Sequence, residues 1–230
     1  MNLKEKLYQI RNNILYAQER HGFDHPVEIV AVTKTRPFNY IKECYRVHIS
    51  AIGENRIQEA VEKFQPFSKM PELIRRFIGH LQSNKVNKCI ELFDTVDSVD
   101  SIKLARKISN RAASLGKIVP VLLEVNTSRE PQKGGFNPEM ADDMLCCINE
   151  KNIQVKGLMT VGPNTRDEDK KRQSFIDLRE LSHYLNQQSG ESKLKELSMG
   201  MSGDYELAVE EGSTMVRLGT ALFGPREQPF

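Results

Sequence analysis

The chain has 230 residues, with 33 basic against 31 acidic side chains and a formal net charge of +2. This length suits one large domain or two small ones, and single α/β barrels commonly occupy about 200–250 residues. A charge so close to zero excludes a global field that would attract nucleic acid or an anionic membrane, so any anion must be captured locally.

Cysteine usage and the start of the chain indicate the compartment. Cys44, Cys89, Cys146 and Cys147 form no C-x-x-C pair and no metal-ligand spacing, so we expect reduced thiols and no metal site. The first six residues are charged, without an apolar signal region, and no apolar run approaches the ~20 residues that a spanning helix needs. We therefore expect a soluble, cytoplasmic protein.

Segments typical of strands and of helices alternate along the chain. Short apolar runs rich in β-branched residues indicate strands covered on both faces, and apolar residues three or four apart predict amphipathic helices. In the first half we expect a helix over about 2–20, a strand over 27–34, a helix over about 39–46, a strand at 49–53, a helix opening near Asn55, a strand over 75–80, a short helix after Ser83 and Asn84, and a strand over 93–98.

The same alternation continues in the second half. We expect a helix from Ile102 to Leu115, a strand over 119–126, a helix through Met144 and Ile148, a strand over 153–159, a helix carrying Phe175 to Leu185, a weak strand at 197–199, a short acidic helix over 206–211, and a strand over 214–218. Thr165, three residues before Glu168, predicts a capping box that opens the long helix, and 187–193 reads as a polar turn.

Eight strand–helix units in this length predict an α/β fold, namely a single (β/α)8 TIM barrel over residues 1–230 with an extra N-terminal helix. An open, doubly wound sheet is the alternative. That fold normally has a G-x-G-x-x-G turn after its first strand, and the corresponding turn here contains no glycine. No linker or low-complexity segment indicates a second domain.

Residues that follow the strands should form one rim, because barrel active sites lie at the carboxyl ends of the strands. Lys34 would end the first strand, since Pro37 cannot supply a ladder N–H. Desolvation there would lower its pKa and make its amine a nucleophile for Schiff-base chemistry. The alternative is a surface lysine that merely ends a strand. The other rim residues are Glu54, Asn55, His80, Ser98, Asn126, Met159, Ser198, Met199, Arg217, Gly219 and Thr220.

An anion cradle is expected after the last two strands. Gly219 and Thr220 would begin a short helix whose free N–H groups and dipole favour a phosphate, and barrels often bind phosphate in these loops. Ser202, between two glycines, would supply the other half. Alternatively, Ser202 simply caps the helix beginning at Asp204.

Other rim residues also have ordinary structural explanations. Asn55 fits an N-cap, with Gln58 in the reciprocal position, and His80 fits a plain rim histidine. Arg36 could lie in solvent. Arg217 could pair with one of three acidic residues, Glu206, Glu210 or Glu211.

Six segments together resemble the pyridoxal phosphate homeostasis protein family, and the resemblance covers nearly the whole chain. They are Ala-Val-Thr-Lys at 31–34, Ile-Gly-Glu-Asn-Arg-Ile-Gln-Glu at 52–59, Phe-Ile-Gly-His-Leu-Gln-Ser-Asn-Lys at 77–85, Gly-Leu-Met-Thr at 157–160, Leu-Ser-Met-Gly-Met-Ser-Gly-Asp at 197–204 and Val-Arg-Leu-Gly-Thr-Ala-Leu-Phe-Gly at 216–224. One departure is glycine in the loop 133–135, where many relatives are expected to have serine.

The resemblance implies a barrel similar to the amino-terminal domain of alanine racemase, with pyridoxal 5′-phosphate (PLP) held as an internal aldimine on Lys34. Ser202, Gly219 and Thr220 would hold the phosphate. Arg217 would approach the pyridine nitrogen and weaken the ring as an electron sink. The residues expected to line the pocket are Asn55, His80, Met159, Ser198 and Met199.

Alanine racemases carry a further β-domain that supplies a second acid/base, whereas this chain ends at Phe230. The resemblance therefore implies a PLP-binding protein of vitamin B6 and amino-acid homeostasis, without established turnover. We expect a monomer that binds PLP. Delivery to PLP-dependent apoenzymes, and to which of them, stays open. Two alternatives remain. One is a PLP-dependent amino-acid racemase, and the other is a cofactor-free Schiff-base lyase of the aldolase type that uses Lys34.

Overall fold

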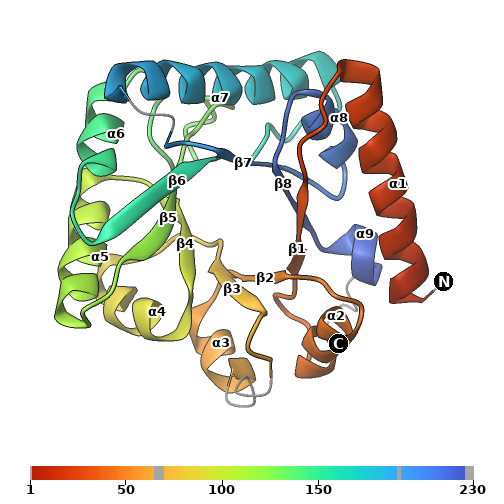
Figure 1. Ribbon diagram of the computed structural model, residues 1–230, viewed down its shortest axis with the longest axis horizontal. Coiled ribbons are helices and arrows are strands. Elements are labelled where there is room, and N and C mark those ends of the chain that lie inside the picture. Colours follow the sequence, from red (N-terminus) through yellow and green to blue (C-terminus); the bar gives the residue numbers. More distant parts are fainter. Residues whose placement is uncertain (1, 65–69, 191–192, 226–230) are drawn as a thin grey trace.

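The computed structural model describes residues 2–64, 70–190 and 193–225. Within these ranges the strands close into a parallel barrel in sequence order, from β1 to β8, and the helices surround it (Figure 1). The strands are β1 Glu28–Val32, β2 Ala51–Glu54, β3 Ile74–Phe77, β4 Thr95–Val99, β5 Val119–Glu124, β6 Ile153–Met159, β7 Glu196–Met201 and β8 Met215–Leu218. The prediction of a (β/α)8 barrel is confirmed.

The expected amino-terminal helix is also present, outside the ring. Asn2 and Glu5 form a capping box at its start, and Gly22 ends it with φ 71°. Asn13 donates to the Tyr205 hydroxyl at 2.9 Å, which ties this helix to α8. The helices are α1 Leu3–His21, α2 Phe38–Arg46, α3 Ile57–Phe64, α4 Val86–Leu92 after the 3-10 turn Ser83–Lys85, α5 Ile102–Ser114, α6 Ala141–Ile148, α7 Glu168–Ser189, α8 Tyr205–Glu210 and α9 Thr220–Phe223.

Strand alternation sorts the apolar side chains into two clusters. A small cluster fills the barrel interior, and a much larger one packs the outer faces of the strands against the helices. The interior members are Val30, Ala51, Leu122, Met159 and Met215. Once one residue of a strand is known to face the interior, the residues two positions before and after it on that strand face the interior too.

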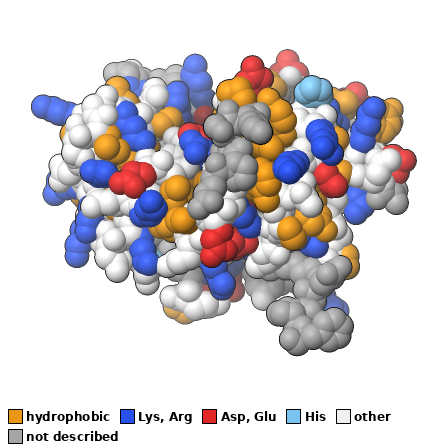
Figure 2. Space-filling view, turned by 90° about the horizontal axis from the view of Figure 1, so that it is seen from below, with side chains coloured by type: hydrophobic (Ala, Val, Ile, Leu, Met, Phe, Trp, Pro, Cys, Tyr) orange, Lys and Arg blue, Asp and Glu red, His pale blue; other side chains and the backbone are white. Residues whose placement is uncertain are grey.

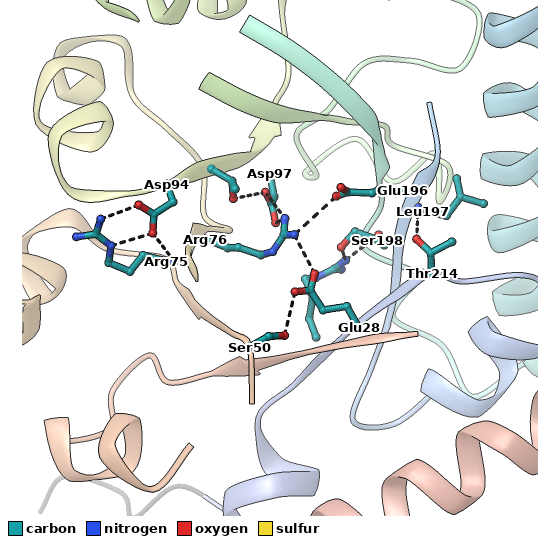
Figure 3. Close-up of polar contacts among 12 residues, drawn as sticks. Glu28, Ser50, Arg75, Arg76, Asp94, Asp97, Glu196, Leu197, Ser198 and Thr214 are labelled. Atoms are coloured by element: carbon teal, nitrogen blue, oxygen red, sulfur yellow. Dashed lines mark hydrogen bonds and ion pairs between the residues drawn. The ribbon is translucent and has the colours of Figure 1, made fainter. Parts of the chain in front are cut away.

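The amino-terminal half of the barrel interior holds an ion cluster (Figure 3). The buried Arg76 guanidinium donates to Glu28 at 2.8 Å and to Asp97 at 3.2 Å, and it lies 3.7 Å from Glu196. Burial alone would lower the pKa of Arg76, but the three carboxylates raise it. This end of the barrel is therefore filled by protein groups, which leaves the carboxyl ends of the strands for a ligand.

Two expected boundaries are wrong. The first strand ends at Val32, so Lys34 lies in the following turn rather than at the strand's last position. The long helix is capped by Asp167, whose carboxylate accepts from the Lys170 N–H, whereas the Thr165 hydroxyl accepts from the Asp167 N–H, before the helix begins. This helix also runs to Ser189, so residues 187–189 of the expected polar turn at 187–193 are helical, and 191–192 lie outside the described residues.

The surface agrees with the balanced composition, because basic and acidic side chains are interspersed on the face shown in Figure 2. Among the helices that the structure describes, none has the length and apolar character required to cross a lipid bilayer.

The four cysteines lead to a first prediction about reactivity. Cys146 is exposed and the other three are buried, and burial, with help from Glu43, raises the pKa of Cys44 to about 12. Burial likewise raises the pKa of Cys147 to about 12 and also raises that of Cys89. Because only a thiolate attacks disulfide reagents, one thiol per native chain should react at pH 8. Spectrophotometric titration with Ellman's reagent checks this, and C146S should react with none until it is unfolded.

Candidate functional site at the carboxyl ends of the strands

The turn after β1 places Lys34 at the rim. Lys34 is half-buried, and the alternation of β1, continued beyond Val32, puts it on the side of Val30, which faces the interior. The turn is closed by the Arg36 N–H, which donates to the Thr33 carbonyl at 3.0 Å. Thr35 has φ 61°, a left-handed conformation that costs a non-glycine residue about 1–3 kcal/mol. Surrounding contacts must therefore hold this turn.

Glu54 and Arg36, near this turn, have protein partners that the sequence did not predict. Glu54 is a rim candidate that does not face the interior, because its carboxylate accepts from Thr33 and from Lys63 of α3. Arg36 does not project freely into solvent, since its guanidinium donates to the carbonyls of Gly224 and Pro225 at 2.7 and 2.8 Å.

Arg217 lies inside the barrel, on the same face of β8 as Met215. Its guanidinium donates to the Ser198 carbonyl at 2.7 Å, to the Ser198 hydroxyl at 2.8 Å and to the Thr160 carbonyl at 2.7 Å. Burial lowers its pKa, and Asp97, Glu124 and Asp204 oppose that shift. Three fixed acceptors from β7 and the end of β6 thus hold one cation in place.

The alternative pairing of Arg217 with Glu206, Glu210 or Glu211 is wrong. Glu210 pairs with Arg20 and Arg172, and Glu211 pairs with Arg172 and Arg179. Glu206 accepts from Asn13 of α1. These carboxylates therefore bind the outer helices together and leave Arg217 to the barrel interior.

The loops after β7 and β8 meet at Ser202. The N–H groups of Gly219 and Ala221 both donate to its hydroxyl, at 3.2 and 3.0 Å. The alternative that Ser202 caps α8 is wrong, because Asp204 holds the N-cap position without a side-chain cap bond. Thr220, the first residue of α9, is exposed beside these donors. The arrangement gathers two backbone donors and two hydroxyls in one place.

The β2 and β3 ends are packed tightly together. A Cβ added at Gly79 would lie 2.5 Å from the Asn55 carbonyl oxygen, so only glycine fits there. The Ser98 hydroxyl donates to the Gly79 carbonyl at 2.6 Å. His80 is exposed, and its Nδ1 lies 3.3 Å from the Asp100 carboxylate. Asn55 and His80 are thus brought side by side at the rim.

The two methionines expected to line the pocket separate. Met159 belongs to the interior cluster, whereas Met199 packs in the outer core between strands and helices. Adjacent residues of a strand face opposite sides, so Ser198 points inward and Met199 outward. Asn126 donates to the Glu130 carbonyl and so shapes the loop after β5. In that loop, the Lys133 ammonium donates to the Gly162 carbonyl at 2.7 Å.

Sequence reasoning missed Glu124, which lies on the same face of β5 as Leu122. Burial and Asp100 raise the pKa of its carboxyl, while Arg217 and His80 lower it. Its inward position follows from counting two residues from Leu122 once the interior register of β5 is known. Glu124 therefore adds a carboxyl to the electrostatics of the rim that holds Arg217 and His80.

Neither of two surface hollows coincides with the rim. One of about 390 Å³ lies mainly over α7 and α8, and its lining includes Ser202 but not Lys34 or Arg217. The larger, about 730 Å³, is lined by residues near the amino-terminal ends of β6 and β7, including Lys156 and Lys195. We assign function to the rim, because its polar groups converge, whereas solvated lysines by themselves define no ligand. In the described ranges no cluster of His, Cys, Asp or Glu is suited to a metal ion.

Comparison with known proteins identifies the class of barrel to which this chain belongs. Residues 6–227 match the model of the alanine racemase N-terminal domain. Alanine racemase of Clostridium difficile superposes with a TM-score of 0.75 at 20% identity, covering 99% of this chain and 56% of the racemase. The fold and the family match thus define a barrel of the alanine racemase amino-terminal class.

Two further relatives are nearer in sequence. The pyridoxal phosphate homeostasis protein of Vibrio alginolyticus is 36% identical over 231 residues, covering 98% of each chain. PipY of Synechococcus elongatus, solved with PLP bound, has a TM-score of 0.86 at 34% identity, covering 97% of this chain and all of PipY. The chain belongs to the pyridoxal phosphate homeostasis protein family.

Proposed function

We propose that this protein binds PLP at the rim, holds it covalently on Lys34 and serves in PLP homeostasis. The observation that carries the proposal is the convergence of the Gly219 and Ala221 N–H groups on Ser202, one strand away from the lysine turn. PipY, a relative similar over its full length, has been solved with PLP bound.

The donor set fits a phosphate. A phosphate group accepts several hydrogen bonds, and backbone N–H groups at the start of a helix are suited to it. Strand β1 pairs with β8 in register from Val30 opposite Arg217 to Ala31 opposite Leu218, so the residues following the two strands are neighbours. An amine from Lys34 and the donors of the β8–α9 junction could therefore contact opposite ends of one small molecule.

Bound PLP would supply an aldehyde that condenses with an amine and a ring that can accept electrons. Lys34 would provide the amine, and Ser202, Thr220 and the Gly219 amide would orient the phosphate. Arg217, held by three acceptors, would place a permanent cation on the interior side of the site. A cation near the pyridine nitrogen would oppose its protonation, so such a site would favour holding the cofactor over carbanion chemistry.

The physiological role is proposed on the resemblance to the family together with this site. We propose that the protein acts as a monomer, stores PLP and passes it to PLP-dependent apoenzymes. A single-base amino-acid racemase is the second candidate, because the chain matches the alanine racemase N-terminal domain and has the fold of an alanine racemase. The cofactor-free lyase remains a third, which a covalent PLP adduct at Lys34 would argue against.

One experiment separates these functions. PLP is added to the purified protein, excess is removed, and borohydride fixes any imine for mass spectrometry. We expect one PLP per chain. The loaded protein is then incubated in deuterium oxide with L- and D-alanine, and NMR follows the α-hydrogen. We expect negligible exchange, because Arg217 weakens the electron sink. Multiple exchange turnovers would support the racemase, and absence of any adduct would refute the proposed function.

A further inference from the structure

Lys34 sits in a turn whose conformation its residues do not favour. Thr35 is β-branched and has φ 61°, a region from which a side chain of this kind is normally excluded. The Thr35 N–H does not point to solvent but donates to the Glu59 carboxylate of α3 at 2.5 Å. A helix distant in sequence therefore holds the amide that immediately follows Lys34.

The carbonyl that immediately precedes Lys34 is held from the same helix. Lys63, one turn after Glu59 on α3, donates to the Thr33 carbonyl at 2.8 Å, to Glu54 at 2.9 Å and to Glu59 at 2.5 Å. An ammonium group has three hydrogens, and these three acceptors can use them all. Its side chain is only 9% exposed, so water competes little for these bonds.

The arrangement is costly to build if its only purpose is packing. The Glu54 side chain is fully buried, and within the described residues its Oε2 has no hydrogen-bond partner. Burial raises the pKa of Glu54, while the contacts with Lys63 and Thr33 oppose that shift. Buried ion networks seldom stabilise a fold better than apolar side chains of similar volume. This network instead makes hydrogen bonds to the main chain on both sides of Lys34, at the Thr33 carbonyl and the Thr35 N–H.

We propose that Glu54, Glu59 and Lys63 form a clamp that positions Lys34 for condensation with an aldehyde ligand. In this assignment Lys63 and Glu59 are positioning residues, because they act on the turn and not on the ligand. The clamp fixes the Thr33 carbonyl and the Thr35 amide, and thereby the direction in which the Lys34 side chain leaves the main chain. The ligand class rests on the proposed function, whereas the clamp itself is a property of the unloaded chain.

The test uses a graded set of variants. E59A removes the acceptor for the Thr35 N–H, E59Q keeps an acceptor oxygen but loses the charge, and K63M removes the ammonium. E62A, an exposed position on the same helix, is the matched control. A core variant distant from the clamp, I108V, controls for lost stability, since Ile108 lies in α5.

Three readouts are made on each variant. Hydrogen exchange reports the Thr35 amide, trinitrobenzenesulfonate labelling with peptide mass spectrometry reports Lys34 in the PLP-free chain, and stopped-flow absorbance reports PLP attachment. We expect E59A and K63M to raise the hydrogen-exchange rate of the Thr35 amide at least tenfold. The rate of Lys34 labelling should change at least threefold, and the rate of PLP attachment should fall at least tenfold. E59Q should fall between E59A and wild type, and E62A and I108V should stay within twofold of wild type.

The outcomes separate the clamp from the proposed function. If wild type attaches no PLP, the proposed function fails, and Thr35 exchange and Lys34 labelling still decide the clamp. If E59A leaves all three readouts at wild-type values, the clamp is refuted while PLP binding stands. Equal changes in the three readouts for I108V and E59A would also refute the clamp, because they would reflect lost stability alone. Should K63M fail to fold, the E59A and E59Q pair decides the question.

Discussion

Replacement of Lys34 by alanine should abolish covalent attachment of PLP while the barrel remains folded. Only a primary amine can form an imine with the aldehyde, and we expect the amine to come from this position. The fold should tolerate the change, because the turn is held through Thr33 and Thr35 and not only through the lysine side chain. Intact mass after borohydride reduction measures the attachment, and circular dichroism measures the fold.

Two further variants sharpen this result. K34R keeps a positive charge but has no amine that forms a stable imine, so it should also attach no PLP. K42A removes an exposed lysine of the neighbouring helix α2 and should attach PLP like wild type. A PLP adduct found on any other lysine of the wild-type chain, mapped by peptide mass spectrometry, would overturn the assignment.

Joint replacement of Ser202 and Thr220 by alanine should lower PLP affinity by about two orders of magnitude or more. Each hydroxyl would donate a hydrogen bond to a charged phosphate, and such bonds contribute roughly 1.5–3 kcal/mol each. Equilibrium titration by absorbance measures the dissociation constant. Pyridoxal, which lacks the phosphate, should bind the double variant and wild type with similar affinity.

The two single variants should differ. In the unloaded chain the Gly219 and Ala221 amides donate to Ser202, so S202A loses one donor to the phosphate but releases two backbone donors. We therefore expect a smaller loss for S202A than for T220A. S114A, an exposed serine on α5, is the control and should leave affinity unchanged. Wild-type affinity in the double variant would place the phosphate elsewhere.

Local patterns in the sequence were enough to predict the barrel and several members of the rim. Apolar runs and helical spacing are local signals, and they located the strand and helix order, the amino-terminal helix and the junction at Gly219. Lys34 and Ser202 could be selected because they directly follow apolar segments. The same local signals could not fix the turn at Lys34, where the strand stops at Val32, or the cap of α7, where Asp167 replaced the expected Thr165.

Which groups face one another became visible in the folded chain and not in its local patterns. Arg217 meets Ser198 and the Thr160 carbonyl across neighbouring strands, and Lys63 meets the Thr33 carbonyl from a helix 30 residues further along. Such pairings depend on barrel register and on which face of each strand is inward, and a periodic pattern in one chain segment does not encode either. For the same reason Met199 fits the rim by its sequence position but packs in the outer core.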